Sequence, residues 1–171
     1  MVNLTVPHSG YVLTGGQSMN PTITEGCNIL GVESWDGNSE LKGEIVAYNH
    51  EYQNVKSYNI ISDIEIEFNW YVHTVVEEYK NYNMSTANHY ITEGGQFVYH
   101  TDNKTVHDTR NNQPYENAKS LEGEHVIILQ GDNNSRIDLE IVPVENVRGV
   151  ADKNKQINLQ SLNNWPCSIL Q

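Results

Sequence analysis

The sequence has few cysteines, few basic residues and no long apolar stretch. Its two cysteines, Cys27 and Cys167, are too few for a disulfide framework, so they form either one disulfide or two buried thiols. Lysine and arginine together number 10 against 22 acidic residues, which gives a formal net charge of −12. This charge repels a phosphate backbone, and no local cluster of basic residues offsets it, so nucleic-acid binding is disfavoured.

Segments that direct a protein to a membrane are also missing. Residues 1–8 have neither a basic start nor an apolar run of signal-peptide length, and no later stretch approaches the roughly 20 apolar residues of a membrane span. We therefore expect a soluble protein with no signal peptide and no transmembrane segment of its own. The sequence does not specify a compartment.

Residues that favour β-strands are abundant, whereas apolar residues at helical spacing are scarce. Ten tyrosines accompany many Val, Ile and Thr residues in short runs, which is typical of β structure. A length of 171 residues suits one domain with its own core. We therefore expect a mostly β fold in a single domain over residues 1–171.

Short apolar runs and alternating patterns locate the expected strands. They cover residues 4–13, 28–32, 44–48, 58–68, 70–76, 125–129 and 141–151. Residues 77–122 are rich in Asn, Tyr, Glu and Thr and predict an inserted β-rich region, with a hairpin over residues 90–100 around Gly94-Gly95 and a turn at Asp102-Asn103. Residues 152–171 are expected to form a polar C-terminal tail.

The turn-rich stretch over residues 15–23 is the strongest candidate for a reactive centre. Gly15 and Gly16 allow left-handed backbone and Asn20-Pro21 turns the chain again, so Ser18 lies between two changes of direction. A serine hydroxyl is a weak nucleophile until a neighbouring base takes its proton. By itself the stretch is better explained as an ordinary turn-rich loop, so a reactive serine requires a base elsewhere in the chain.

The residues that could assist the serine also have ordinary structural explanations. His73 lies in an apolar strand, where most histidines are satisfied core or surface residues. Asp132 and Asp138 follow strand signals, and aspartates in such turns usually bond nearby N–H groups. Irregular spacing in a polar region favours solvated side chains over a metal site for three further histidines, His89, His100 and His107. We expect no metal and no cofactor.

Three separated pieces of the chain, in order, resemble the type I signal peptidases. They are Gly16-Gln17-Ser18-Met19-Asn20-Pro21-Thr22-Ile23, then Gly43-Glu44-Ile45-Val46 with Val72-His73-Thr74-Val75-Val76-Glu77, then Gly131-Asp132-Asn133-Asn134 through Asp138 to Val142-Pro143 and Val147-Arg148-Gly149-Val150-Ala151. Bacterial members of that family use a lysine base. The histidine and two valines in this chain are similar to the archaeal and endoplasmic-reticulum branch.

The resemblance spans most of the chain and implies the β-ribbon fold that signal peptidases share with the LexA repressors. It implies a serine endopeptidase that cleaves extended peptides after small residues through an acyl-enzyme. Ser18 would be the nucleophile, His73 the general base and Asp138 the carboxylate that orients the histidine.

Supporting roles follow from the same resemblance. Asp132 would shape the loop that carries Asp138, and the backbone N–H of Ser18 would stabilise the oxyanion. Gly16, Met19 and Pro21 would support the serine turn. The partner would be a peptide or protein substrate.

Several positions depart from the family pattern. Cys27 and Glu44 replace aspartates, Thr74 replaces an arginine, and Gly16 replaces a serine that adds an oxyanion donor in many members. Family members usually have a membrane anchor before the serine, whereas seventeen polar and turn-forming residues precede Ser18 here.

These departures leave two alternatives to a soluble endopeptidase. One is a non-enzymatic or weakly active relative that serves as a structural or interaction component of a larger assembly, such as a virus particle. The other is a self-cleaving regulator like the LexA repressors, which use a lysine base and usually carry a helical DNA-binding domain. Neither of those two features is visible in this sequence.

Overall fold

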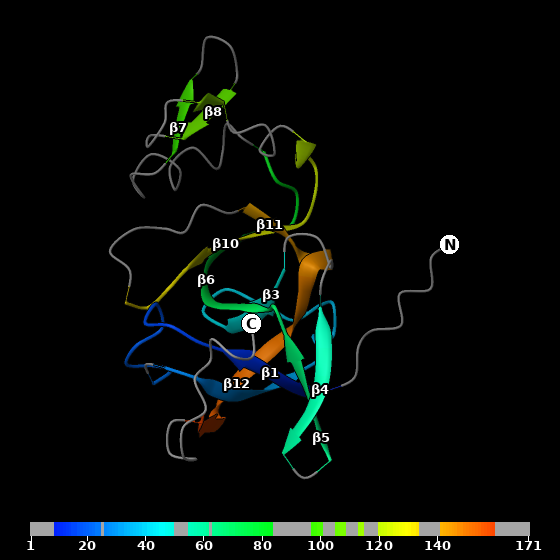
Figure 1. Cartoon of the computed structure of the whole chain (residues 1–171). Helices are drawn as coiled ribbons and strands as arrows, with labels where there is room; N and C mark the ends of the chain where they lie inside the picture. Colours follow the sequence, from blue (N-terminus) through cyan, green and yellow to red (C-terminus); the bar gives the residue numbers. More distant parts are fainter. Residues whose placement is uncertain are drawn as a thin grey trace.

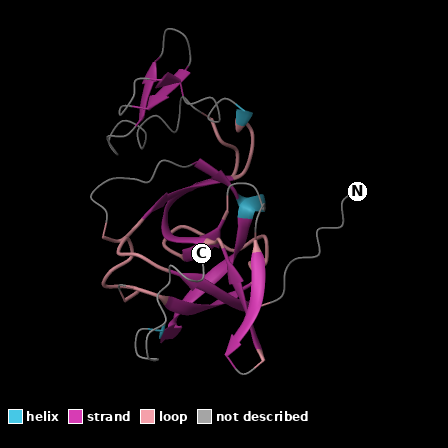
Figure 2. Cartoon of the chain, in the orientation of Figure 1, coloured by secondary structure: helices cyan, strands magenta, loops and turns pink. Residues whose placement is uncertain are grey.

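The computed structural model describes residues 9–24, 26–49, 55–61, 63–83, 97–100, 105–108, 113–114, 120–133 and 141–159. Their regular structure is almost entirely β-strand, as Figure 2 shows. The expected mostly β class is therefore confirmed. In the described part of the chain, no helix has the length and hydropathy needed to cross a membrane.

A nine-stranded mixed sheet forms the body of the molecule (Figure 1). Its strand order is β11-β10-β6-β3-β12-β2-β1-β5-β4. All neighbours are antiparallel except β1 and β5, which are parallel. The strands are β1 (Gly10–Thr14), β2 (Asn28–Glu33), β3 (Ile45–Tyr48), β4 (Lys56–Ile61), β5 (Ile64–Phe68), β6 (Tyr71–Tyr79), β10 (Val126–Gln130), β11 (Ile141–Pro143) and β12 (Val147–Asn158). A 3-10 helix, η1 (Val144–Asn146), separates β11 from β12.

The region expected as an insertion contains a second sheet of three antiparallel strands, β7 (Phe97–His100), β8 (Thr105–Asp108) and β9 (Gln113–Pro114). Strands β7 and β8 pair antiparallel from Phe97 with Asp108 to His100 with Thr105, and the turn expected at Asp102-Asn103 lies outside the described residues. The hairpin expected around Gly94-Gly95 lies outside the described residues, as does His89. Strand β6 continues to Tyr79, inside the expected insertion, because it still pairs with β10 there.

The segment expected as one strand over residues 58–68 forms two strands, β4 and β5, which pair antiparallel. Asp63 lies between them with a φ of 65°, a left-handed conformation that aspartate adopts more readily than most residues. Strands β4 and β5 both alternate apolar and polar side chains with the same period, so the sequence pattern alone did not show the turn between them.

Strand β12 extends well into the segment expected as a polar tail. Beyond an irregularity between Asp152 and Gln156, residues Gln156, Ile157 and Asn158 pair with β2. Backbone hydrogen bonds to β2 supply the strand structure here, although the outward side chains are polar. The expected tail boundary at residue 152 is therefore too early by at least seven residues. Residues 160–171 lie outside the described residues.

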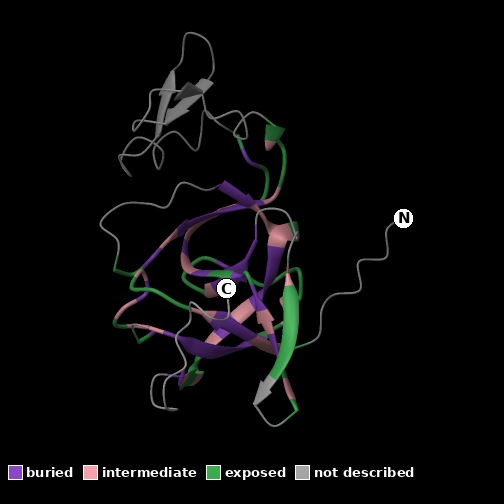
Figure 3. Cartoon of the chain, viewed as in Figure 1, coloured by how far each residue is buried: buried purple, intermediate pink, exposed green. Residues whose placement is uncertain are grey.

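Buried side chains gather along the central strands, whereas the described part of edge strand β4 is exposed (Figure 3). One apolar cluster includes Met19 and Ile23, from the stretch that contains Ser18, with Val72 of β6. A second includes Tyr48 of β3 with Leu129 of β10. Each fully buried side chain of this size contributes about 1.5–3 kcal/mol to folding, so the two clusters fix β3, β6 and the serine stretch in one body.

Cys27 is buried and disulfide-bonded, which agrees with the first of the two cysteine alternatives. The other cysteine of the sequence, Cys167, lies outside the described residues. The backbone N–H of Leu159 donates to the carbonyl oxygen of Cys27 at 2.8 Å. The end of β12 is therefore attached to the chain just before β2.

Candidate active site

The stretch that follows β1 forms a turn around Ser18. Gly16 has a φ of +99°, the left-handed conformation expected from its sequence. The N–H of Asn20 donates to the carbonyl of Gln17 at 3.1 Å and closes the turn. Met19 is 5% exposed and packs in the core, which anchors the turn from below. Ser18 is half-buried rather than fully exposed.

His73 projects from β6 toward this turn. It lies opposite Val46 of β3 in the sheet. The Oγ atom of Ser18 is 3.0 Å from Nε2 of His73, although the two residues are 55 positions apart in the chain. A general base must lie within hydrogen-bond distance of the hydroxyl that it deprotonates, and these two side chains meet that requirement.

The other ring nitrogen of His73 contacts a tyrosine. The Oη atom of Tyr48 is 2.8 Å from His73 Nδ1, and the two ring centroids are 5.9 Å apart. Tyr48 is only 1% exposed. Asp138, which the family resemblance implies at this position, lies outside the described residues.

Asp132 connects the two sides of the site. Its carboxylate accepts a hydrogen bond from the hydroxyl of Thr22, just after the serine turn. It accepts another, at 2.6 Å, from the hydroxyl of Thr74, the residue after His73. The carboxylate therefore links the serine turn to β6, whereas the role expected for Asp132 in shaping the loop that carries Asp138 stays a prediction.

The loop after β10 also holds the serine turn through its backbone. The N–H of Asn133 donates to the carbonyl of Ser18 at 2.7 Å, and the Asn133 side chain donates to the carbonyl of Gln17 at 3.1 Å. The N–H of Asp132 contacts the sulfur of Met19 at 3.4 Å. Pro21, exposed and joined to Asn20 by a cis peptide bond, completes the turn.

This arrangement has the chemistry of an assisted serine. A neutral imidazole whose proton is on Nδ1 presents a lone pair at Nε2, and that lone pair can accept the proton of Ser18. Among the described residues, no group of three or more His, Cys, Asp or Glu side chains is placed to bind a metal ion.

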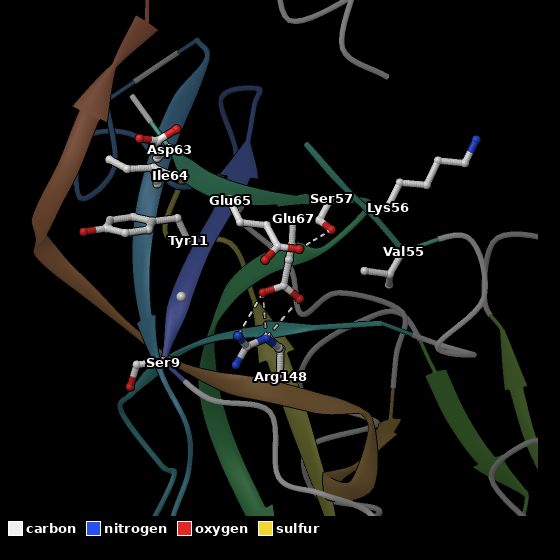
Figure 4. A pocket seen from close by; sticks show the side chains of 11 residues that line it. Ser9, Tyr11, Val55, Lys56, Ser57, Asp63, Ile64, Glu65, Glu67 and Arg148 are labelled. Carbon is white, nitrogen blue, oxygen red and sulfur yellow. Dashed lines mark hydrogen bonds and ion pairs between the residues drawn. The ribbon is translucent and has the colours of Figure 1, made fainter. Parts of the chain in front are cut away.

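An open cavity of about 540 Å³ lies elsewhere, lined mainly by residues of β1, β4 and β5 (Figure 4). At one side Arg148 of β12 contacts Glu67 of β5, with Nη2 2.8 Å from Oε2 and Nε donating to both carboxylate oxygens. Ser18 and His73 do not line this cavity. The ion pair instead joins two strands that are not neighbours in the sheet.

The sequence did not predict the contact of Tyr48 with His73 or the bonds of the two threonines. A signal for Tyr48 was present, because residues two apart in a strand share a face and Tyr48 is two residues beyond Val46. To predict the contact from this signal would have required the register of β3 against β6, which no local pattern specifies.

Compared with known proteins, the chain matches no family model, no curated protein and no solved structure.

Proposed function

We propose that this protein is a serine endopeptidase similar to the histidine branch of the type I signal peptidases, with the corresponding fold. One observation carries the proposal, namely the 3.0 Å separation between Ser18 Oγ and His73 Nε2. A nucleophile and a base within hydrogen-bond reach, with the base contacted at its other nitrogen, is the arrangement that activates a serine. The order of the three motifs along the chain supports the same family.

The proposed reaction is hydrolysis of a peptide bond in two steps. Nε2 of His73 takes the proton of Ser18 as the Oγ atom attacks the substrate carbonyl, and the N–H of Ser18 stabilises the oxyanion. The imidazolium then gives its proton to the leaving amine, which departs and leaves an acyl-enzyme. A water molecule, deprotonated by His73, attacks the ester and releases a carboxylic acid and free Ser18.

The preference for extended peptides with a small residue before the cleaved bond follows from the family resemblance. A slow enzyme is expected, because Gly16 has no hydroxyl to act as a second oxyanion donor. Loss of one such donor reduces kcat by roughly a hundredfold or more.

The test is cleavage of extended peptides that carry alanine before the scissile bond. Wild type should cleave them, Ser18→Ala should not, and the matched variant Ser9→Ala, at an exposed serine, should match wild type. Activity should rise between about pH 6 and 7, as a histidine base requires. Equal inertness of wild type and Ser18→Ala would instead favour the structural component of a larger assembly, and a rise near pH 9 would contradict a histidine base.

A further inference from the structure

We propose that Tyr48 is the positioning residue of His73, with its phenol oxygen accepting the hydrogen bond from Nδ1–H. The inference rests on the proposed function, because it concerns the same serine and histidine. A carboxylate is the usual partner at this nitrogen. Here a neutral phenol would hold the ring in the tautomer that leaves Nε2 free for Ser18.

The position of Tyr48 is fixed by the fold. In the pairing of β3 with β6, Val46 lies opposite His73 and Tyr48 lies opposite Tyr71. Tyr48 therefore occupies the diagonal position to His73 on the same face of the sheet. The side chain of Asn49, the next residue, donates to the carbonyl of Asn69 at 3.1 Å and fixes the end of β3.

The surroundings of the phenol leave it little freedom. Tyr48 is 1% exposed and packs with Leu41, Val75 and Leu129. Its ring lies against Tyr71, with centroids 5.7 Å apart, and against His73 on another side. A buried aromatic ring with packed neighbours holds its hydroxyl in one place. The 2.8 Å contact with Nδ1 is therefore preorganised.

The tautomer decides whether this contact assists the reaction. If Nδ1 donates to Tyr48, Nε2 has a free lone pair and accepts the Ser18 proton. If Tyr48 donates to Nδ1, Nε2 carries the hydrogen and cannot act as a base. In the proposed arrangement the phenol keeps its own proton throughout, and the Nδ1–H bond strengthens when His73 becomes an imidazolium.

The first measurement needs no variant of Tyr48. In wild-type protein labelled with ¹⁵N-histidine, the ring signals of His73 are identified by their loss in His73→Gln. Above the midpoint of its titration His73 should carry its hydrogen on Nδ1. A neutral His73 with the hydrogen on Nε2 would overturn the proposal, whether or not the protein cleaves peptides.

The second measurement uses Tyr48→Phe, which keeps the packed ring and removes only the hydroxyl. We expect kcat to fall about tenfold, the scale of one lost hydrogen bond, with KM within twofold of wild type. The acidic limb of the rate profile should move to lower pH, because the lost bond favours the imidazolium. The control is Tyr58→Phe, at a tyrosine that is 55% exposed on β4, and it should match wild type.

The outcomes separate this inference from the proposed function. Activity equal in wild type and Ser18→Ala would remove the proposed function, while the tautomer measurement would still decide the role of Tyr48. If the enzyme is active and depends on Ser18, but Tyr48→Phe changes neither its rate nor its pH profile, only the proposed role of Tyr48 is wrong. If the acidic limb of the rate profile moves to higher pH in Tyr48→Phe, the phenol of Tyr48 donates the hydrogen bond to Nδ1, which would overturn the proposal. An Nδ1–H tautomer that survives Tyr48→Phe and is lost in Asp138→Asn would assign the positioning role to Asp138.

Discussion

Replacement of Asp132 by alanine should loosen the serine turn from the histidine strand. The carboxylate accepts hydrogen bonds from Thr22 on one side and from Thr74 on the other. Without it the two hydroxyls turn to water, and the serine turn keeps its backbone hydrogen bonds, the contacts made by Asn133 and its core packing. The expected result is a less stable protein and a slower one.

The magnitude follows from the two lost bonds. Asp132 is exposed, so water competes for both threonines and each bond contributes at the low end, about 0.5–1 kcal/mol. The free energy of unfolding should therefore fall by about 1–2 kcal/mol. For a chain of this size the corresponding fall in Tm is about 2–8 °C. A displacement of about 1 Å in a reacting group costs roughly a hundredfold in rate. Because the backbone bonds of Asn133 remain, we expect a smaller loss of about tenfold in kcat.

Urea unfolding followed by tryptophan fluorescence measures the stability, and peptide cleavage measures the rate. Double-mutant cycles of Asp132→Ala with Thr22→Val and with Thr74→Val should each give a coupling energy of about 0.5 kcal/mol or more. The control is Asp152→Ala, which removes the same charge from β12, where the carboxylate accepts a local hydrogen bond from the backbone N–H of Asn154. Zero coupling to both threonines together with an unchanged kcat would refute the bridging role of Asp132.

Three further predictions concern the stability of the fold. In urea titrations, Gly149→Ala should lower the free energy of unfolding by about 3 kcal/mol, because the new Cβ would lie 2.2 Å from a backbone oxygen of β2. The comparison variant is Gly43→Ala, at a position where φ is +86° but the space is open, and it should lower the free energy of unfolding by only about 1–2 kcal/mol. Glu67→Gln should cost on the order of 3 kcal/mol, because it breaks the ion pair of the buried Arg148, and thermal unfolding that does not change would contradict this. The backbone N–H groups of Ser39 and then Asn38 lower the pKa of Asp36 below its ordinary 3.8, so the stability that this carboxylate adds is complete above that pH and disappears as the pH falls through the lowered value. Asp36→Asn should therefore be less stable than wild type at pH 7 in urea titrations, and the difference should shrink as the pH falls below 3.8. A difference that does not change with pH would contradict the charge effect.

Much of the sheet could be predicted from local patterns. The cores of β2, β3, β6 and β10 are short apolar runs bounded by turn formers, which is why the expected and observed bounds agree within a few residues. Two predictions were wrong, the single strand over residues 58–68 and the polar tail from residue 152, and both errors have the same origin. The alternation in residues 58–68 hides a hairpin, and the polar end of β12 is a strand because β2 lies beside it. Both depend on pairing with distant residues.

The candidate site was predicted in part. The family resemblance selected Ser18 and His73, and their proximity depends on the core cluster to which their neighbours Met19 and Val72 both belong. Tyr48 was missed because a buried tyrosine at the end of an apolar strand has the same local pattern as an ordinary core residue. Only the register between β3 and β6 distinguishes it.

We propose that Ser18 is a nucleophile activated by His73. A serine-directed peptidyl phosphonate with the alanine analogue next to phosphorus tests this directly, with intact mass and peptide mapping as the readout. Wild type should gain one phosphonyl group on Ser18, and Ser18→Ala and His73→Gln should gain none. Equal labelling of wild type and Ser18→Ala, or no labelling of wild type at any pH from 6 to 9, would contradict it.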